Sequence, residues 1–470
     1  MSTHADRAGA VFETIAAPLW VVVCGVAVAA CGGYLLGLGH LLPVAGAAAV
    51  LAATLLAYRW PVPVAMVVLL VSGGYSVLAM TPLWNIKATT LGGGVRVEDV
   101  FMLGMLAAGL LRASTRSGRR RLGRLLAPFL LLGAWLGLET LRNMGSYGLS
   151  APGELRFFYL LLAVAFCLVA SLDHEDRVRV ALKGYVLITV ALPLVLLPLV
   201  LALKGWSFGP SARIFPSHVS LGLLLGLAVL WQGRDFVPWP RGALYLATAL
   251  GALEILSDAH RSVWLAAIVI LAILLLLRQT LSAKIRWTFL GILLVATLVV
   301  AAQGLGYDVV GVIAARGGAV LAQEDTAGIR LSLWRASLPL IAESPVVGRG
   351  LGMYWNLYLP DYGYTVHDFP HSLYVMVLVN LGAVGMLLFA WLWVATWRIC
   401  AVARRTAEHA GVHAMPCFAY ASVGLITLGA IAAYGVAYGF ELYSTTLAGI
   451  CAAGVMLSAS GGPADPTGDD

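Results

Sequence analysis

The sequence predicts an all-α, polytopic integral membrane protein. Of its 470 residues, 60% are hydrophobic and 11% are charged, and the mean hydropathy is +0.89. A soluble protein of this length could not cover its surface with so few polar side chains. Apolar runs of ~20 residues, the length that crosses a bilayer as a helix, recur along the whole chain. We therefore expect about 12–14 transmembrane helices.

The predicted spans are apolar runs separated mostly by short polar or basic connections, and one or two of them could be split or re-entrant. The first span follows MSTHADRAGAVFETIAA, which carries little positive charge and has no convincing cleavage site. It is therefore expected to be a retained helix and not a signal peptide. The spans are expected near residues 18–37, 41–58, 61–80, 98–112, 125–142, 156–172, 180–203, 216–232, 242–257, 261–278, 287–303, 370–397, 415–434 and 436–457.

Four regions are expected along the chain. Only one connection between spans is long, and loops of that length are uncommon unless they are functional. The polar, Gly/Pro-rich end SASGGPADPTGDD is expected to be disordered. The regions are an N-terminal transmembrane bundle (1–303), an outer or periplasmic loop (304–369), the C-terminal transmembrane helices (370–457) and a cytoplasmic tail (458–470).

The long loop is expected to contain short helices, and one of them has a clear pattern. The stretch TAGIRLSLWRASLPLIAESP predicts an amphipathic helix capped by Thr326. Arg330 and Trp334 would lie one turn apart on the same side of it. Beyond this helix, Gly348, Gly350 and Gly352 are expected to form a flexible link.

The basic residues predict the orientation. The net charge is +7, but most basic residues lie in short loops that fall on one side when both termini are placed in the cytoplasm, as the positive-inside rule requires. The run RASTRSGRRRLGR is the strongest of these loops, and is better explained as a topology anchor beside anionic lipid than as a nucleic-acid patch.

A second set of basic residues falls on the outer side. Nearly all are arginines, whose planar guanidinium suits bidentate binding of phosphate. An outer face with these side chains at the ends of spans suggests an anionic ligand. The outer basic residues are Lys87, Arg96, Arg142, Arg156, Lys204, Arg213, Arg261, Arg316, Arg330, Arg335 and Arg349.

Three patterns on the outer side indicate a site. Arg213 precedes a span in SARIFPSHVSLGLLLG, Arg261 begins one in SDAHRSVWLAAIVI, and the long loop returns to the membrane at PHSLY with His371. Each arginine alone could simply bind a lipid phosphate at the interface, and His371 alone could be a polar helix cap. Together with Arg330 they could clamp a diphosphate beside a general base.

These motifs, with R-x3-W-R, ESPVVGRGLGMY and NLGAVG, resemble the O-antigen ligase and O-antigen polymerase superfamily. The resemblance covers roughly residues 95–400 and includes VRVEDVFMLGMLAAGLLR as an early span. It implies a GT-C-like membrane glycosyltransferase that moves a glycan from undecaprenyl diphosphate to an acceptor hydroxyl on the outer face of the cell inner membrane. The chain departs from the common pattern at Ser372, where relatives often have Asn, and at Arg349, which lies between the loop glycines.

The resemblance implies a role for each residue type. Arg213 and Arg261 would hold the diphosphate, and Arg330 would bind either the diphosphate or the acceptor. His371 would accept the proton of the acceptor hydroxyl, with inversion at the anomeric carbon. Possible additional contacts are Trp334, Arg335, Arg349, His218 and His260.

No metal or cofactor is expected. A glycosyltransferase that uses Mg²⁺ or Mn²⁺ would need clustered outer carboxylates. Glu98–Asp99 and Glu324–Asp325 are the only adjacent outer pairs, and neither forms an Asp-x-Asp motif. The histidines show no zinc-ligand spacing, and the six cysteines contain no CxxC pair and lie in or beside apolar runs, as small core residues do.

Several functions remain open. A ligase would transfer the polymer to lipid A–core, whereas a polymerase of O-antigen or exopolysaccharide would extend the lipid-linked chain by the same chemistry. A third variant would glycosylate a protein. A transporter or flippase for an anionic lipid-linked substrate is the alternative from another class, but it should show inverted repeats and charges at mid-span. The sequence shows no internal repeat, and its arginines lie at span ends.

Overall fold

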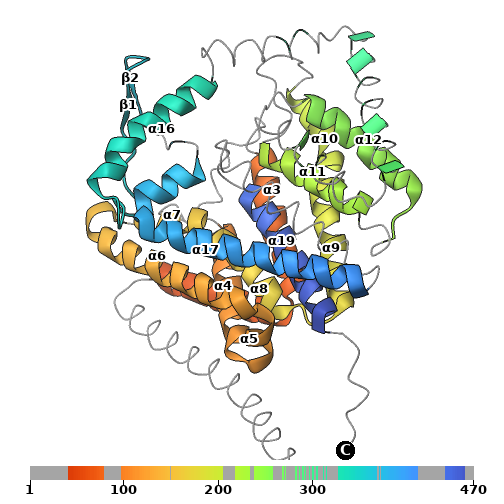
Figure 1. Ribbon diagram of the computed structural model, residues 1–470, viewed down its shortest axis with the longest axis horizontal. Coiled ribbons are helices and arrows are strands. Elements are labelled where there is room, and N and C mark those ends of the chain that lie inside the picture. Colours follow the sequence, from red (N-terminus) through yellow and green to blue (C-terminus); the bar gives the residue numbers. More distant parts are fainter. Residues whose placement is uncertain are drawn as a thin grey trace, which may run out of the picture.

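The computed structural model describes residues 41–78, 97–148, 150–204, 217–232, 238–257, 326–367, 370, 372–410 and 440–460, with scattered single positions between 267 and 314. The described chain is almost entirely helical (Figure 1), so the predicted all-α class is confirmed. The helices are α2 (Leu41–Arg59), α3 (Pro61–Leu78), α4 (Val97–Ser114), α5 (Arg116–Leu122), α6 (Leu126–Tyr147), α7 (Ser150–Leu155), α8 (Leu161–Ser171), α9 (Glu175–Val186), α10 (Leu192–Lys204), α11 (Ser217–Gln232), α12 (Arg241–Ser257), α16 (Thr326–Glu343), α17 (Leu373–Ala410) and α19 (Phe440–Ser460).

Several of these helices can cross a membrane. Within the described part of the chain, three stretches are long and apolar enough: Arg116–Tyr147, Glu175–Pro198 and Leu373–Ile399. A fourth is a pair of helices, Gly153–Leu160 and Leu162–Ser171, which are bent by 44° at their junction. The protein is therefore a polytopic membrane protein, as predicted. The total of 12–14 spans stays a prediction, because the expected spans at 18–37, 261–278, 287–303 and 415–434 lie wholly or mostly outside the described residues.

Small residues let the helices of the bundle pack closely. A Cβ on Gly104 of α4 would lie 2.6 Å from the Cβ of Ala53 on α2. A Cβ on Gly449 of α19 would lie 2.7 Å from the Cα of Ala165 on α8. Close approach of this kind is the usual way in which membrane helices gain packing energy, since lipid offers no hydrophobic driving force between them.

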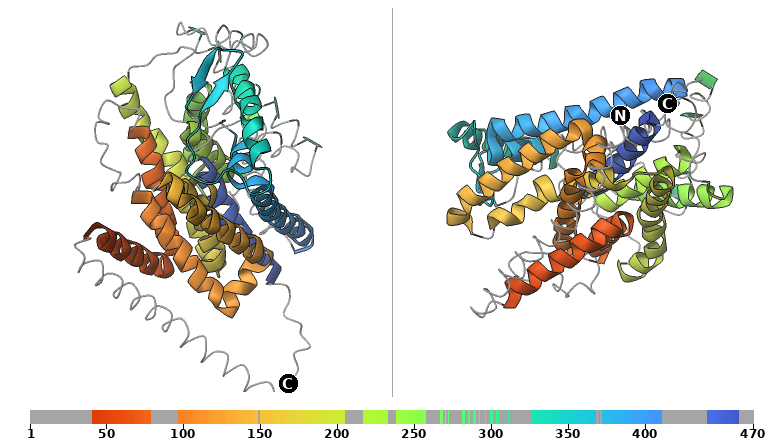
Figure 2. Two further views of the ribbon diagram at one scale, coloured as in Figure 1. Left: turned by 90° about the vertical axis from the view of Figure 1, so that its left-hand side faces the viewer. Right: turned by 90° about the horizontal axis from the view of Figure 1, so that it is seen from below.

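α6 and α17 form one side of the molecule. They lie side by side over much of their length in Figure 1 and in the right-hand view of Figure 2. The ring of Phe129, near the start of α6, stacks on Tyr159 and on Phe166 of α8, with ring centroids 4.6 Å and 3.9 Å apart. This apolar cluster fixes the first turn of α6 against α8.

Two short π-helical turns and one 3₁₀ turn interrupt the helices. The 3₁₀ turn η2 (Gly123–Leu125) joins α5 to α6, and the π turns η3 (Arg156–Leu160) and η4 (Leu187–Ala191) lead into α8 and α10. The basic run before α6, expected as a connection between spans, forms the helix α5. Thr115 begins it by accepting the Gly118 N–H at 3.0 Å.

Residues 326–367, which we call the outer segment after their expected position, contain a β-hairpin that was not predicted. β1 (Leu357–Leu359) pairs antiparallel with β2 (Tyr364–Val366). Gly363 has φ +70° and closes the turn by donating its N–H to the carbonyl of Leu359 at 2.9 Å. Leu357 and Leu359 are buried and pack with Leu333 of α16. The outer segment therefore has its own small core of helix and hairpin.

Candidate functional site

The structure describes only part of the predicted site. His218 lies in the first turn of α11, where only its backbone is described. Arg213, His260, Arg261 and His371 lie outside the described residues. The proposed convergence of the arginines on His371 therefore stays a prediction. The described elements that flank these residues nevertheless form a well-defined framework.

The helix ends next to Arg213 and Arg261 lie together. The Ser220 hydroxyl on α11 donates to Oε1 of Glu254 on α12 at 2.8 Å, and both residues are at most 1% exposed. α11 begins at Ser217, four residues after Arg213, and α12 ends at Ser257, four residues before Arg261. The hydrogen bond therefore joins the two helices near the ends from which the chain continues to the predicted arginines.

α16 is attached to the segment where the chain re-enters the bundle. The indole N–H of Trp334 donates to the carbonyl of Pro370 at 2.8 Å, and Pro370 directly precedes His371. Arg330 lies one turn earlier on the same helix and is partly exposed, and Arg335 is exposed. Trp334 thus fixes the helix that carries both arginines next to the predicted base.

The glycine loop, residues 344–352, is a packed turn and not the flexible link that was expected. Gly348, Gly350 and Gly352 have φ values of +74°, +98° and +83°, which favour glycine strongly. A Cβ at Gly348 would collide with the backbone of Asn380, and a Cβ at Gly350 would collide with the side chain of Asn143. These glycines are required because other segments of the protein approach them too closely for a side chain.

The glycine loop completes hydrogen bonds that α17 leaves open. Gly382 has φ +64° and ψ −165°, so it breaks α17 one third of the way into its membrane-spanning part. In an unbroken helix the N–H groups of residues 383 and 384 would bond to the carbonyls of residues 379 and 380. The break separates these four groups, and each needs a new partner because it lies in a membrane-spanning helix, where lipid offers none.

The loop provides all four partners. The N–H groups of Arg349 and Gly350 donate to the carbonyls of residues 379 and 380 at 2.8 and 2.9 Å. The N–H groups of Ala383 and Val384 donate to the carbonyls of residues 345 and 346 at 2.8 and 3.1 Å. We call this set of four hydrogen bonds the loop–helix ladder. It fixes the glycine loop to the first part of α17, which follows His371.

Glu154 on α7 joins the two sides of the ladder. One of its carboxylate oxygens accepts the N–H of Gly352 at 2.9 Å and the side-chain amide of Asn380 at 3.0 Å. The Asn380 side chain is fully buried. A carboxylate is a strong acceptor, and two donors from separate segments make Glu154 a cross-link between the glycine loop and α17.

α6 supports the loop from the other side. Arg142 donates to the carbonyl of Gly348 at 2.9 Å and forms an ion pair of 2.6 Å with Glu139. The side chain of Asn143 donates to the backbone carbonyl of Glu139 at 2.7 Å. The charged side chain of Glu139 is buried, and Arg142 compensates its charge while it holds the loop.

These framework residues had only weak signals in the sequence. Arg142 appeared among the outer basic residues, but nothing connected it to the loop. Glu154 is an isolated acidic residue at the beginning of a predicted span, and an ionisable residue at such a position usually has a specific partner or function. Arg349, expected as an additional phosphate contact, forms a partly exposed ion pair with Glu343 at 3.4 Å.

A comparison with known families agrees with this framework. A family model described as O-antigen ligase matches residues 246–390. The match supports the resemblance to the O-antigen ligase and polymerase superfamily over this part of the chain. No curated protein gives a significant match to the chain.

The matched segment of the chain contains several of the elements described above. It includes Glu254, α16, the hairpin, the glycine loop and the break in α17, together with the positions of Arg261 and His371. Arg213 and His218 precede it. Members of this family are membrane glycosyltransferase-like enzymes, so the predicted class of enzyme is supported.

Proposed function

We propose that this protein is an O-antigen ligase-type glycosyltransferase. It would transfer a glycan from undecaprenyl diphosphate to a hydroxyl of lipid A–core, on the outer face of the cell inner membrane, with both termini in the cytoplasm. The observation that carries the proposal is that the O-antigen ligase match covers α16, the glycine loop and the start of α17 as one block. The ladder, Glu154 and Trp334 hold the same three elements together.

The chemistry requires little beyond a phosphate clamp and a base. Diphosphate is a good leaving group, so the enzyme must mainly stabilise the negative charge that grows on it and activate the incoming hydroxyl. In our proposal Arg213, Arg261 and Arg330 bind the diphosphate. His371 takes the proton of the hydroxyl as its oxygen attacks the anomeric carbon, and the diphosphate leaves from the opposite face with the bonding electrons.

The framework supports this assignment through rigidity. The rate of a reaction catalysed by positioned groups falls steeply when those groups are slightly misplaced. His371 lies between Pro370, which Trp334 holds, and the part of α17 that the ladder fixes. A base at this position would be restrained from both sides along the chain.

The test is a transfer assay with the full chain reconstituted in vesicles. Undecaprenyl-diphosphate glycan and lipid A–core are supplied with EDTA, and the glycosylated product is measured. We expect His371→Ala and Arg261→Ala each to lower the rate by roughly 10²–10⁴-fold, the usual effect of removing a catalytic base or a charge-stabilising donor.

Two variants serve as matched controls. Arg241→Ala removes the same side chain at the opposite end of α12, and His174→Ala removes a histidine before α9. Both should retain the wild-type rate. Wild-type rates in His371→Ala and Arg261→Ala would contradict the mechanism, and loss of activity in EDTA would contradict the metal-independent form.

The same assay separates ligase from polymerase. Both enzymes need the diphosphate clamp and the base, and they differ in the acceptor. Transfer that requires lipid A–core supports the ligase. Extension of the lipid-linked glycan when no lipid A–core is present would make the protein a polymerase.

A further inference from the structure

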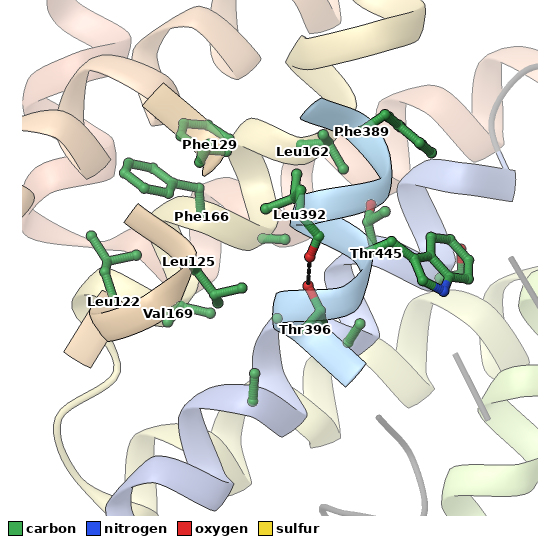
Figure 3. A pocket seen from close by; sticks show the side chains of 16 residues that line it. Leu122, Leu125, Phe129, Leu162, Phe166, Val169, Phe389, Leu392, Thr396 and Thr445 are labelled. Atoms are coloured by element: carbon green, nitrogen blue, oxygen red, sulfur yellow. Dashed lines mark hydrogen bonds between the residues drawn. The ribbon is translucent and has the colours of Figure 1, made fainter. Parts of the chain in front are cut away.

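An apolar pocket lies between α6, α8, α17 and α19 (Figure 3). It contains about 740 Å³ of space that protein atoms do not fill, including the part open to the surroundings. Its walls include Leu125, Phe129, Phe166, Phe389 and Leu392. Nearly all of the lining is apolar, so the pocket is unsuited to water or a sugar.

The few hydroxyl groups in the wall do not make the pocket polar. Thr396 donates its hydroxyl to the carbonyl of Leu392 at 2.8 Å, as Figure 3 shows. Thr445 donates to the carbonyl of Leu442 at 3.3 Å. Both hydroxyls are thus used within their own helices, and the side chains present methyl groups and hydrocarbon to the pocket.

The pocket is far from the glycine loop. Leu125, which directly precedes α6, lines the pocket, and Arg142 of α6 contacts the loop; these residues are about 25 Å apart at 1.5 Å per helical residue. Along α17, the pocket residues Phe389 to Thr396 lie about 10–20 Å beyond the break at Gly382. Since the hydrocarbon core is ~30 Å thick, the pocket extends into the half of the membrane opposite the outer segment.

The wall of the pocket continues into a strongly basic helix. Leu122 and Leu125, both buried, come from the segment that also carries Arg119, Arg120 and Arg124. These three arginines are exposed. Within the described residues no ion pair joins any of them to a carboxylate. An apolar pocket with surplus positive charge beside it matches a molecule with a hydrocarbon chain and an anionic head.

We infer that this pocket binds an anionic phospholipid of the leaflet next to α5. One acyl chain occupies the space between α6, α8, α17 and α19, and the phosphate lies against the arginines of α5 and η2. The occupant is chemically distinct from the glycan donor, and the site lies in the other half of the bilayer. The inference is independent of the proposed transfer reaction.

Binding is measured by native mass spectrometry on the full chain in detergent. Phosphatidylglycerol and phosphatidylcholine with identical acyl chains are titrated separately. We expect one phosphatidylglycerol to bind at least tenfold more tightly than phosphatidylcholine. Each arginine near the membrane surface should contribute about fivefold, so Arg120→Gln/Arg124→Gln should weaken phosphatidylglycerol by ~30-fold.

The control for charge is Arg59→Gln/Arg241→Gln. It removes the same number of exposed positive charges at the ends of α2 and α12, and it should leave the affinity unchanged. Equal loss in both double variants would show that only the general surface charge matters, and would overturn a site at α5. Equal affinity of the two lipids for the wild type would also overturn it.

The chain pocket is tested separately. Ala448→Leu adds three carbon atoms at a position that lines the pocket, and should weaken phosphatidylglycerol at least tenfold. Ala249→Leu adds the same atoms at an exposed position of α12, and should have no effect. Unchanged binding to Ala448→Leu would overturn the pocket. If that variant does not fold, Thr396→Leu fills the same space from α17 and is subject to the same criterion.

Discussion

Replacement of Glu154 by alanine should open the glycine loop without unfolding the protein. The change leaves the N–H of Gly352 and the side-chain amide of Asn380 without their shared acceptor. A hydrogen bond to a charged group contributes about 1.5–3 kcal/mol, and the two bonds share one oxygen. We therefore expect a loss of about 2–3 kcal/mol in the local stability of the loop.

Hydrogen exchange followed by mass spectrometry measures this loss directly. A local destabilisation of about 2–3 kcal/mol corresponds to roughly 30–150-fold faster exchange. The faster exchange should appear in peptides that cover residues 344–352 and 379–384, since the ladder joins these two segments. Peptides from α8 and α19 should keep their wild-type rates.

Two further variants of this position and its surroundings sharpen the test. Glu154→Gln keeps an oxygen that can accept both bonds and loses only the charge, so its effect should be about 1 kcal/mol. Glu343→Ala removes an exposed glutamate at the edge of the same loop, where the ion pair with Arg349 contributes at most about 1 kcal/mol. If Glu154→Ala and Glu343→Ala changed exchange equally, the cross-link would not have the role we assign to Glu154.

Two other substitutions test the same framework. Gly382→Ala places a side chain at φ +64° against the backbone of the glycine loop, and should cost at least about 2 kcal/mol in thermal unfolding. The control is Gly137→Ala on α6, whose new side chain meets no atom within 4 Å. It should be neutral or stabilising by up to about 1 kcal/mol. Equal effects of Gly382→Ala and Gly137→Ala would contradict the strain argument. Trp334→Phe removes the hydrogen bond to Pro370, which contributes about 1 kcal/mol. We expect the transfer rate to fall severalfold, and KM to change by a smaller factor. Trp60→Phe, at an exposed tryptophan, is its control, and a full rate in Trp334→Phe would show that this bond does not position the site.

The helices could be predicted from the sequence because their signal is local. An apolar run of suitable length is expected to be a helix in lipid, where a helix satisfies almost all of its backbone groups within its own segment. α4, α11 and α12 accordingly begin and end within one or two residues of the expected positions. The amphipathic helix that begins at Thr326 followed from the same kind of local pattern.

The arrangement of the glycine loop could not be predicted in this way. Glycine is compatible both with a flexible link and with a packed turn at positive φ, and only the neighbouring segments decide between them. The partners of Gly348 and Gly350 lie on α6 and α17, far away in the sequence. Glu154 was missed for the same reason, because its two donors come from separate segments and no local pattern connects them.

The loop–helix ladder has a consequence for how the outer segment can evolve. Because residues 345–350 and 379–384 complete each other's hydrogen bonds, a change in the backbone path of either stretch would leave backbone groups of the other unpaired. The chain between them, with the β-hairpin, leaves and returns at one fixed point. That intervening chain can therefore change in length and composition while the ladder and the break in α17 stay the same.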